Sequence, residues 1–316
     1  NSLVSLSPNR LSFKQSRTNF NNAGLVSLNA IFNPIEKLKI KTLGFFNLDE
    51  TDFFRNSIDI VDVSDTNFNN TEDYELRNKQ TIAFGKLDII YNISKTKMLK
   101  AITKYNNGDF DDGSSLVFNE NSTLENLQRQ NTLLDQKINY TNKFKDKKVF
   151  LLTGRFIDEK TPQYYRLNNF LYQDLFPENV DANNVSQFSE NQMQFAGINV
   201  HLLDRKENGH LLELQLGNEF RKDKLWTKFS LLEDDTVLEQ PIRYQNQTIY
   251  QVNDLFLKSK YRLKIQDYGL IGNLNFHQLF NLLENNGNIS SQNPFFINLG
   301  IGFDMKINEK NKIISS

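Results

Sequence analysis

The sequence contains no cysteine among its 316 residues. This absence excludes a disulfide framework, a thiolate metal site and a cysteine nucleophile. Histidine is scarce as well, and His201, His210 and His277 do not have the local spacing of a zinc site. The chain also lacks a glycine-rich phosphate loop and a nucleophile elbow. We therefore expect no metal, no cofactor and no enzymatic activity.

Long apolar runs and an excess of charge of one sign are also missing. No stretch of about 18 apolar residues occurs, so the sequence predicts no transmembrane helix. The formal net charge is −1, and no nucleic-acid partner is expected without a basic stripe. The hydrophobic fraction of 38% does not exclude a membrane, because a barrel strand presents only every second residue to lipid.

The chain does contain a pronounced alternation of apolar and polar residues, which is typical of β-strands. The alternating segments are about 9 to 11 residues long, the length of a tilted membrane-spanning strand. They come in pairs joined by short polar turns. Six pairs can be traced, the last of them cut short: 24–46, 83–105, 134–156, 196–216, 255–276 and from 297 onward.

Charged side chains fall on the face of these segments opposite to the apolar one. A lipid-facing surface requires this separation, because a charge at the bilayer midplane costs about 2–4 kcal/mol. The main alternative is a soluble antiparallel sheet, which shows the same alternation with its apolar face inward. Its connections rarely exceed about 15 residues. The segments between our pairs are longer: 47–80, 106–130, 158–194 and 221–251.

Aromatic residues recur near the ends of the predicted strands, for example Phe46, Tyr105 and Phe156. This placement fits the aromatic girdles at the two membrane interfaces. We therefore predict an all-β fold: a partial antiparallel up-and-down transmembrane β-barrel of about 12 strands in the outer membrane. Short turns would face the periplasm and long loops the exterior, and the expected partners include outer-membrane lipids.

One predicted strand carries a ladder of basic residues on its luminal face. It could attract an anionic substrate or pair with acidic residues of a plug domain. The favoured alternative is a solvated wall, or pairing with neighbours such as Glu213 and Glu219. The ladder consists of Lys258, Lys260, Arg262 and Lys264.

An acidic cluster at 107–113 is the second candidate site. Asp109, Asp111 and Asp112 lie among glycines there, and carboxylates are suitable calcium ligands. Their spacing does not match an EF-hand loop. The favoured alternative is a polar turn at the base of an outer loop.

Three stretches resemble barrel strands of large TonB-dependent receptors that have an N-terminal carboxypeptidase-regulatory-like domain: Gly85–Tyr91, Asp135–Tyr140 and Asn253–Tyr261. The resemblance covers nearly the whole chain. It implies a barrel of about 22 strands, plugged by an N-terminal domain. It also implies energy supplied through TonB, and a scarce nutrient such as an iron chelate, a glycan or a peptide as substrate.

The sequence departs from that family in having no plug domain, no TonB box and no terminal aromatic strand. We therefore interpret residues 1–316 as part of one barrel domain, with the plug and the C-terminal strands absent from this chain. More strands are expected on both sides, because an open sheet edge is not viable in lipid. TonB would be contacted through the missing N-terminal part. The alternative function is a non-transporting barrel that docks a surface lipoprotein, a secretion complex or an assembly complex.

Overall fold

A computed structural model of the chain describes residues 19–63, 66–144, 147–169, 182–265, 268–306 and 312–315. These residues form one antiparallel sheet of 14 strands, and a short 3-10 turn lies at Ile242–Tyr244. Among them, no helix is long and apolar enough to cross a membrane. The predicted all-β fold is confirmed.

The strands follow one another through the sheet in an up-and-down order, each paired with the next. Two short strands lie off this path: β9 (Thr236–Glu239) pairs with β8, and β12 (Asn288–Gln292) pairs with β11. The strands on the path are β1 (Asn19–Ile35), β2 (Leu38–Val63), β3 (Thr66–Asn92), β4 (Lys97–Phe118), β5 (Asn121–Phe144), β6 (Lys148–Asn168), β7 (Asn184–Arg205), β8 (Leu211–Glu233), β10 (Asn246–Ile265), β11 (Tyr268–Asn285), β13 (Phe295–Lys306) and β14 (Lys312–Ser315).

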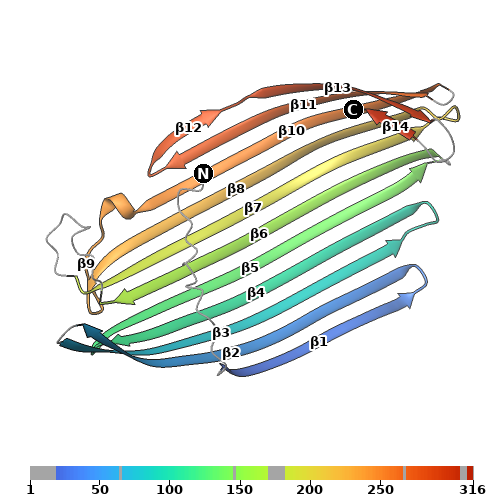
Figure 1. The fold of residues 1–316 in the computed structure, drawn as a ribbon. Helices are drawn as coiled ribbons and strands as arrows, with labels where there is room; N and C mark the ends of the chain where they lie inside the picture. The colour runs from blue at the N-terminus through green and yellow to red at the C-terminus, as the bar shows by residue number, and fades with distance from the viewer. Residues whose placement is uncertain are drawn as a thin grey trace.

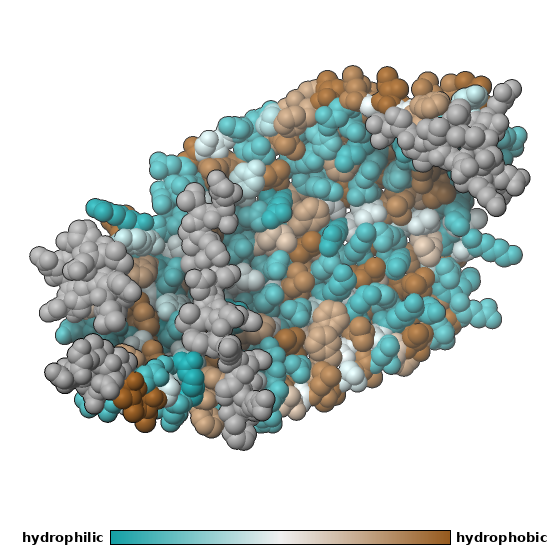
Figure 2. Space-filling view, viewed as in Figure 1, coloured by the Kyte–Doolittle hydropathy of each residue, from teal (hydrophilic) through white to brown (hydrophobic). Residues whose placement is uncertain are grey.

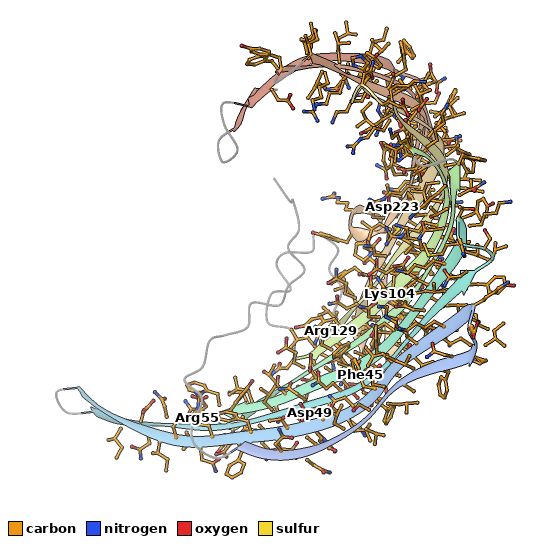
Figure 3. The ribbon with its side chains drawn as sticks, turned by 90° about the vertical axis from the view of Figure 1, so that its right-hand side faces the viewer. Phe45, Asp49, Arg55, Lys104, Arg129 and Asp223 are labelled. Atoms are coloured by element: carbon orange, nitrogen blue, oxygen red, sulfur yellow. The ribbon has the colours of Figure 1, made fainter. Side chains whose placement is uncertain are left out.

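The sheet curves into an open trough (Figure 1). Seen along the strands, it forms an arc in which the β1 edge and the edge at β13 and β14 stay apart (Figure 3). The predicted strand pairs are therefore present as hairpins of a partial, unclosed barrel. The turn expected at 308–311 after the sixth pair's first strand lies outside the described residues.

The two faces of the sheet have opposite character, as the alternation predicts. Cross-strand partners share a face, so Val26 lies beside Phe46 on the outer side. At the β13 edge, Leu299 and Ile301 of the same outer face are 78% and 81% exposed. On the concave side, Figure 3 shows charged residues such as Lys104. Within the membrane-spanning segments, the charged side chains thus point into the barrel, and the outward row is mostly apolar.

Figure 2 views the concave face directly, with hydrophilic residues over much of the wall and apolar ones between them. A small apolar core also lies on this face, where Val185 and Leu231 are buried with Ala182. Leu167 and Phe229 pack against this cluster. The inner wall is therefore polar for most of its area but locally packed near the outer strand ends.

The segments expected to be long outer loops are mostly strand. β2 and β3 have 26 and 27 residues, whereas about 10 are enough to cross the bilayer. The segment 106–130 likewise forms a hairpin of β4 and β5, which turns only at Asn119 and Glu120, both with positive φ. These extensions stand in water on both faces. They therefore need no apolar face, and the alternation that marks a membrane strand fades there.

Outward leucines near the middle of the spanning segments test this orientation. Leu214→Arg in β8 or Leu274→Arg in β11 should lower the free energy of unfolding by about 2–4 kcal/mol or block insertion, because each places a charge in hydrocarbon. The measurement is urea unfolding of the protein inserted in lipid vesicles. Lys260→Leu, on the inner face, is the control and should insert normally. Equal losses for the outward and inward variants would show that the faces are assigned wrongly.

Candidate functional site

The basic ladder lies on the inner face of β10. Lys258, Lys260, Arg262 and Lys264 alternate with outward residues such as Leu257 and Tyr261. In register, Lys260 lies between Glu213 of β8 and Asn273 of β11. Among the described residues, the three lysines of the ladder form no ion pair. The ladder therefore presents cationic groups to the barrel interior.

Arg262 is the member of the ladder that the fold neutralises. Its Nη2 lies 2.5 Å from Oδ2 of Asp304 on β13, and Asp304 is only 3% exposed. The intervening strand β11 contributes Gly269, where a Cβ atom would collide with the Asp304 carboxylate. This glycine leaves the space through which the charge pair spans three strands.

An aromatic platform lies at the other end of the ladder. Phe256 is 3% exposed, and its ring stands 4.5 Å from Nζ of Lys258. The ring also stacks on His277, whose Nδ1 lies 3.0 Å from Asp254. On β8, Gly217 leaves room for the platform, because a Cβ atom there would lie 2.5 Å from the Phe256 ring. The cation–aromatic contact holds one lysine near the wall.

A second charged cluster on the inner face links three neighbouring strands. Asp135 of β5 accepts hydrogen bonds from Arg155 of β6 at 3.0 Å and from Lys104 of β4 at 3.3 Å. Two cations thus share one carboxylate that is 8% exposed. This arrangement stabilises the wall and leaves net positive charge beside the lumen.

The acidic cluster is not a turn, and its carboxylates do not converge. Residues 107–113 lie within β4, fully paired with β3 and β5. Asp112 points inward and binds Arg129 at 2.6 Å. Asp109 and Asp111 point outward, where Asn107 and Asn126 donate hydrogen bonds to them. No group of three acidic or histidine side chains in the described part of the chain could hold a metal ion.

The outer ends of the strands carry a luminal network that the sequence did not reveal. Tyr165 of β6 donates a 2.8 Å hydrogen bond to Glu125 of β5, which also accepts one from Ser114 of β4. Burial, together with the Glu125 carboxylate, raises the pKa of Tyr165 well above its usual value. Nearby, Arg55 pairs with Glu72. Counting inward positions past the membrane segment would have found these residues, but not their contacts.

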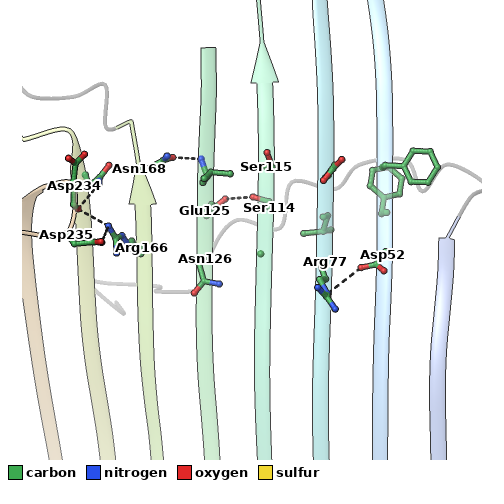
Figure 4. Close-up of a pocket in the computed structure, with 17 residues that line it drawn as sticks. Asp52, Arg77, Ser114, Ser115, Glu125, Asn126, Arg166, Asn168, Asp234 and Asp235 are labelled. Carbon is green, nitrogen blue, oxygen red and sulfur yellow. Dashed lines mark hydrogen bonds and ion pairs between the residues drawn. The ribbon is translucent and has the colours of Figure 1, made fainter. Parts of the chain in front are cut away.

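An open hollow of about 790 Å³ lies at the outer strand ends and reaches from β2 to the β8–β9 turn. Figure 4 shows the residues that line it. Its two arginines are both engaged. Arg166 lies 2.5 Å from Asp235, and Arg77 pairs with Glu50 and lies 3.8 Å from Asp52. The hydrogen bond from Arg77 lowers the pKa of Glu50 below its usual value. Neighbouring carboxylates thus neutralise both arginines of the hollow.

No protein-family model matches the chain, and no curated protein matches it. Solved structures with a similar course include the siderophore receptor PiuA from Acinetobacter baumannii, at 8% identity and a TM-score of 0.34, covering 92% of this chain and 59% of that one. The outer membrane protease OmpT from Escherichia coli has 10% identity, a TM-score of 0.24, and coverages of 90% and 95%. The transport unit of the autotransporter AIDA-I, also from Escherichia coli, has 12% identity and a TM-score of 0.15, and the match covers 96% of this chain and 94% of that one.

The described strands form the wall of an outer-membrane β-barrel. Its outward apolar rows and up-and-down order establish this, and the predicted location in the outer membrane stands. The chain spans 59% of the length of the siderophore receptor. At these TM-scores the likenesses assign no activity.

The expectation that the chain is not an enzyme is wrong as a deduction from missing motifs. One of the similar structures is itself a protease built as an outer-membrane barrel. Strands of a barrel bring together residues far apart in sequence, so a catalytic group there needs no local motif.

The charge pair on the ladder can be tested by mutation. Arg262→Gln should lower the free energy of unfolding by about 2 kcal/mol, since it removes the Arg262 cation from the buried Asp304 carboxylate. The cost stays below that of breaking a fully buried pair because Arg262 is partly solvated. Asp304→Asn should lower the free energy of unfolding by less than Arg262→Gln does. The loss in the double variant should be smaller than the sum of the two single losses. Urea unfolding in vesicles gives these values.

The matched control for the charge pair is Lys260→Gln, which removes a charge from the same face of the same strand without breaking an ion pair. It should change the free energy of unfolding by less than about 0.5 kcal/mol. Strictly additive effects of Arg262→Gln and Asp304→Asn would show that the two groups are not coupled.

Proposed function

We propose that this chain is part of the wall of a TonB-dependent outer-membrane transporter, which imports a scarce nutrient through a plugged barrel. The observation that supports the proposal is that the strands form an open arc whose inner face is polar and carries cationic side chains. TonB would act through an N-terminal part of the protein, and the substrate class is an iron chelate, a glycan or a peptide.

The curvature of the sheet supports a wide bore. A barrel of about eight strands is filled by its own side chains, whereas barrels of about 16 to 22 strands enclose a channel or a plug. Here the path β1 to β14 runs through twelve strands and remains an open arc. A barrel completed at this curvature has more strands. Its bore is too wide to be selective unless another body occupies it.

The charges of the inner wall suit such an occupant. Lys258 and Lys260 offer cations to the lumen, while Arg262 and Asp304 already neutralise each other. An acidic plug surface or an anionic substrate would complement the two lysines. Paired charges such as Asp135 with Arg155 keep the wall rigid around the occupant.

The test uses the full-length protein in its own cells. With a labelled nutrient of each substrate class, uptake should require both the protein and TonB, and should disappear when the upstream TonB-contacting segment is deleted. Lys258→Gln/Lys260→Gln should weaken uptake several-fold while leaving assembly intact. Lys39→Gln, which removes a luminal charge far from the ladder, is the control.

Uptake that persists without TonB would overturn the proposal in favour of an open pore. Absence of uptake for every substrate class, together with a stable complex at the cell surface, would favour a docking barrel. The strand extensions beyond the membrane, 47–63 of β2 and 66–80 of β3, support that alternative. They would give a surface lipoprotein a rigid platform.

A further inference from the structure

The outward face of β8 changes character where it leaves the hydrocarbon. Leu212, Leu214 and Leu216 occupy its apolar row, and Phe220 is the last apolar member. The next outward positions are basic and aromatic. We define the β8 patch as these positions with the aromatic neighbour on β7: Lys222, Lys224, Trp226, Lys228 and Phe188.

Aromatic packing organises the centre of the β8 patch. Trp226 is the only tryptophan of the chain and is 49% exposed. Its ring meets Phe188 edge-on, with centroids 5.2 Å apart and an interplanar angle of 72°. Phe188 pairs in register with Lys228. Two aromatic rings therefore lie between lysines on a surface continuous with the lipid-facing row.

The lysines of the β8 patch have mostly neutral neighbours. Lys222 lies between Gln194 and Gln251, and Lys224 between Gln192 and Ile249. In the described part of the chain, none of the three lysines of the patch forms an ion pair.

The acidic residue nearest to the patch in register is Glu190, opposite Trp226, and Lys160 of β6 lies 3.9 Å from it. On the inward side of β8, Arg221 pairs with Asp223 at 2.8 Å. The positive charge of the patch is thus left for a ligand from outside the barrel.

We propose that the β8 patch binds the phosphate groups of lipid headgroups in the outer leaflet. Lys222 follows Phe220 by two residues, about 7 Å along the strand and about 5 Å along the membrane normal for a tilted strand. That step leads from the girdle into the headgroup layer, which is about 5–8 Å deep on each side of the bilayer. By the same measure Lys224 stands about 9 Å above Phe220, while Trp226 and Lys228 stand about 14 and 19 Å above it, over the layer. The stems of Lys222 and Lys224 can lie along the apolar surface while their ammonium groups reach the phosphates, and Trp226 lies just above these contacts.

A lipid is the occupant that the surroundings favour. The patch continues the row that already contacts acyl chains, so headgroups of the same lipids reach it first. Each basic residue near an anionic surface strengthens binding by roughly fivefold. Outward charges elsewhere lack this surplus: Arg77 is held by Glu50 and Asp52. The inference rests on the outer-membrane location and is independent of transport.

Fluorescence of Trp226 offers a direct test. The full-length protein is placed in vesicles of zwitterionic phospholipid that contain a small fraction of nitroxide-labelled lipid, either anionic or zwitterionic, with the label next to the headgroup. The Trp226 signal is the difference between the parent and Trp226→Phe. The anionic quencher should act at least fivefold more strongly than the zwitterionic one, and this preference should fall at high salt.

Matched variants assign the preference to the patch. In the triple variant Lys222→Gln/Lys224→Gln/Lys228→Gln, both labelled lipids should quench Trp226 fluorescence equally. The corresponding triple arginine variant should restore the stronger quenching by the anionic lipid. A triple variant of inward lysines, Lys39→Gln/Lys100→Gln/Lys137→Gln, removes the same charge and should behave as the parent. Membrane assembly of each variant is verified by its heat-modifiable electrophoretic mobility.

Equal quenching of the parent by the two lipids would overturn the proposal. So would a preference that survives in the triple glutamine variant. Protection of Trp226 from both quenchers would also contradict it, because it would mean that a protein partner covers the patch instead of lipid.

Discussion

The absence of water in the bilayer interior is the constraint on which this structure depends. Every backbone N–H and C=O group there must pair within the protein, and an antiparallel ladder is one of the few ways to achieve this. The pairing of β2 with β3 accordingly runs from Leu38 and Tyr91 to Val63 and Thr66 without a shift. An unbroken ladder fixes the alternation of side chains, and so it decides which residues meet lipid and which meet the lumen.

The chemistry of the inner wall follows from that register. Charged residues excluded from the outer face collect inside, where neighbouring strands bring them within reach of each other. Asp304 reaches Arg262 across β11 because Gly269 leaves the space, while Lys258 rests against Phe256. Some cations are neutralised and others stay available to a luminal partner. The same backbone hydrogen bonding continues beyond the bilayer, where it forms rigid hairpins above the membrane.

The spanning strands were predictable from sequence because one face of each must be apolar to contact lipid, and this requirement produces the alternation of apolar and polar residues. The outer extensions were not, since water on both sides removes the pattern. The turn expected at 107–113 is wrong for a related reason. The glycines and aspartates of this stretch favour turns locally, but pairing with β3 and β5 overrides that preference. The contact between Arg262 and Asp304 depends on the register of three strands, which no single segment specifies.

A cysteine scan along β8 tests the inside-out arrangement most directly, since the sequence has no cysteine of its own. Single cysteines at positions 211–220 of the protein in vesicles are probed with a nitroxide label, and its accessibility to oxygen, which concentrates in lipid, is compared with that to a water-soluble nickel chelate. The account predicts oxygen maxima at 212, 214 and 216 and nickel maxima at 213, 215 and 219. A uniform profile, or one of opposite phase, would contradict it.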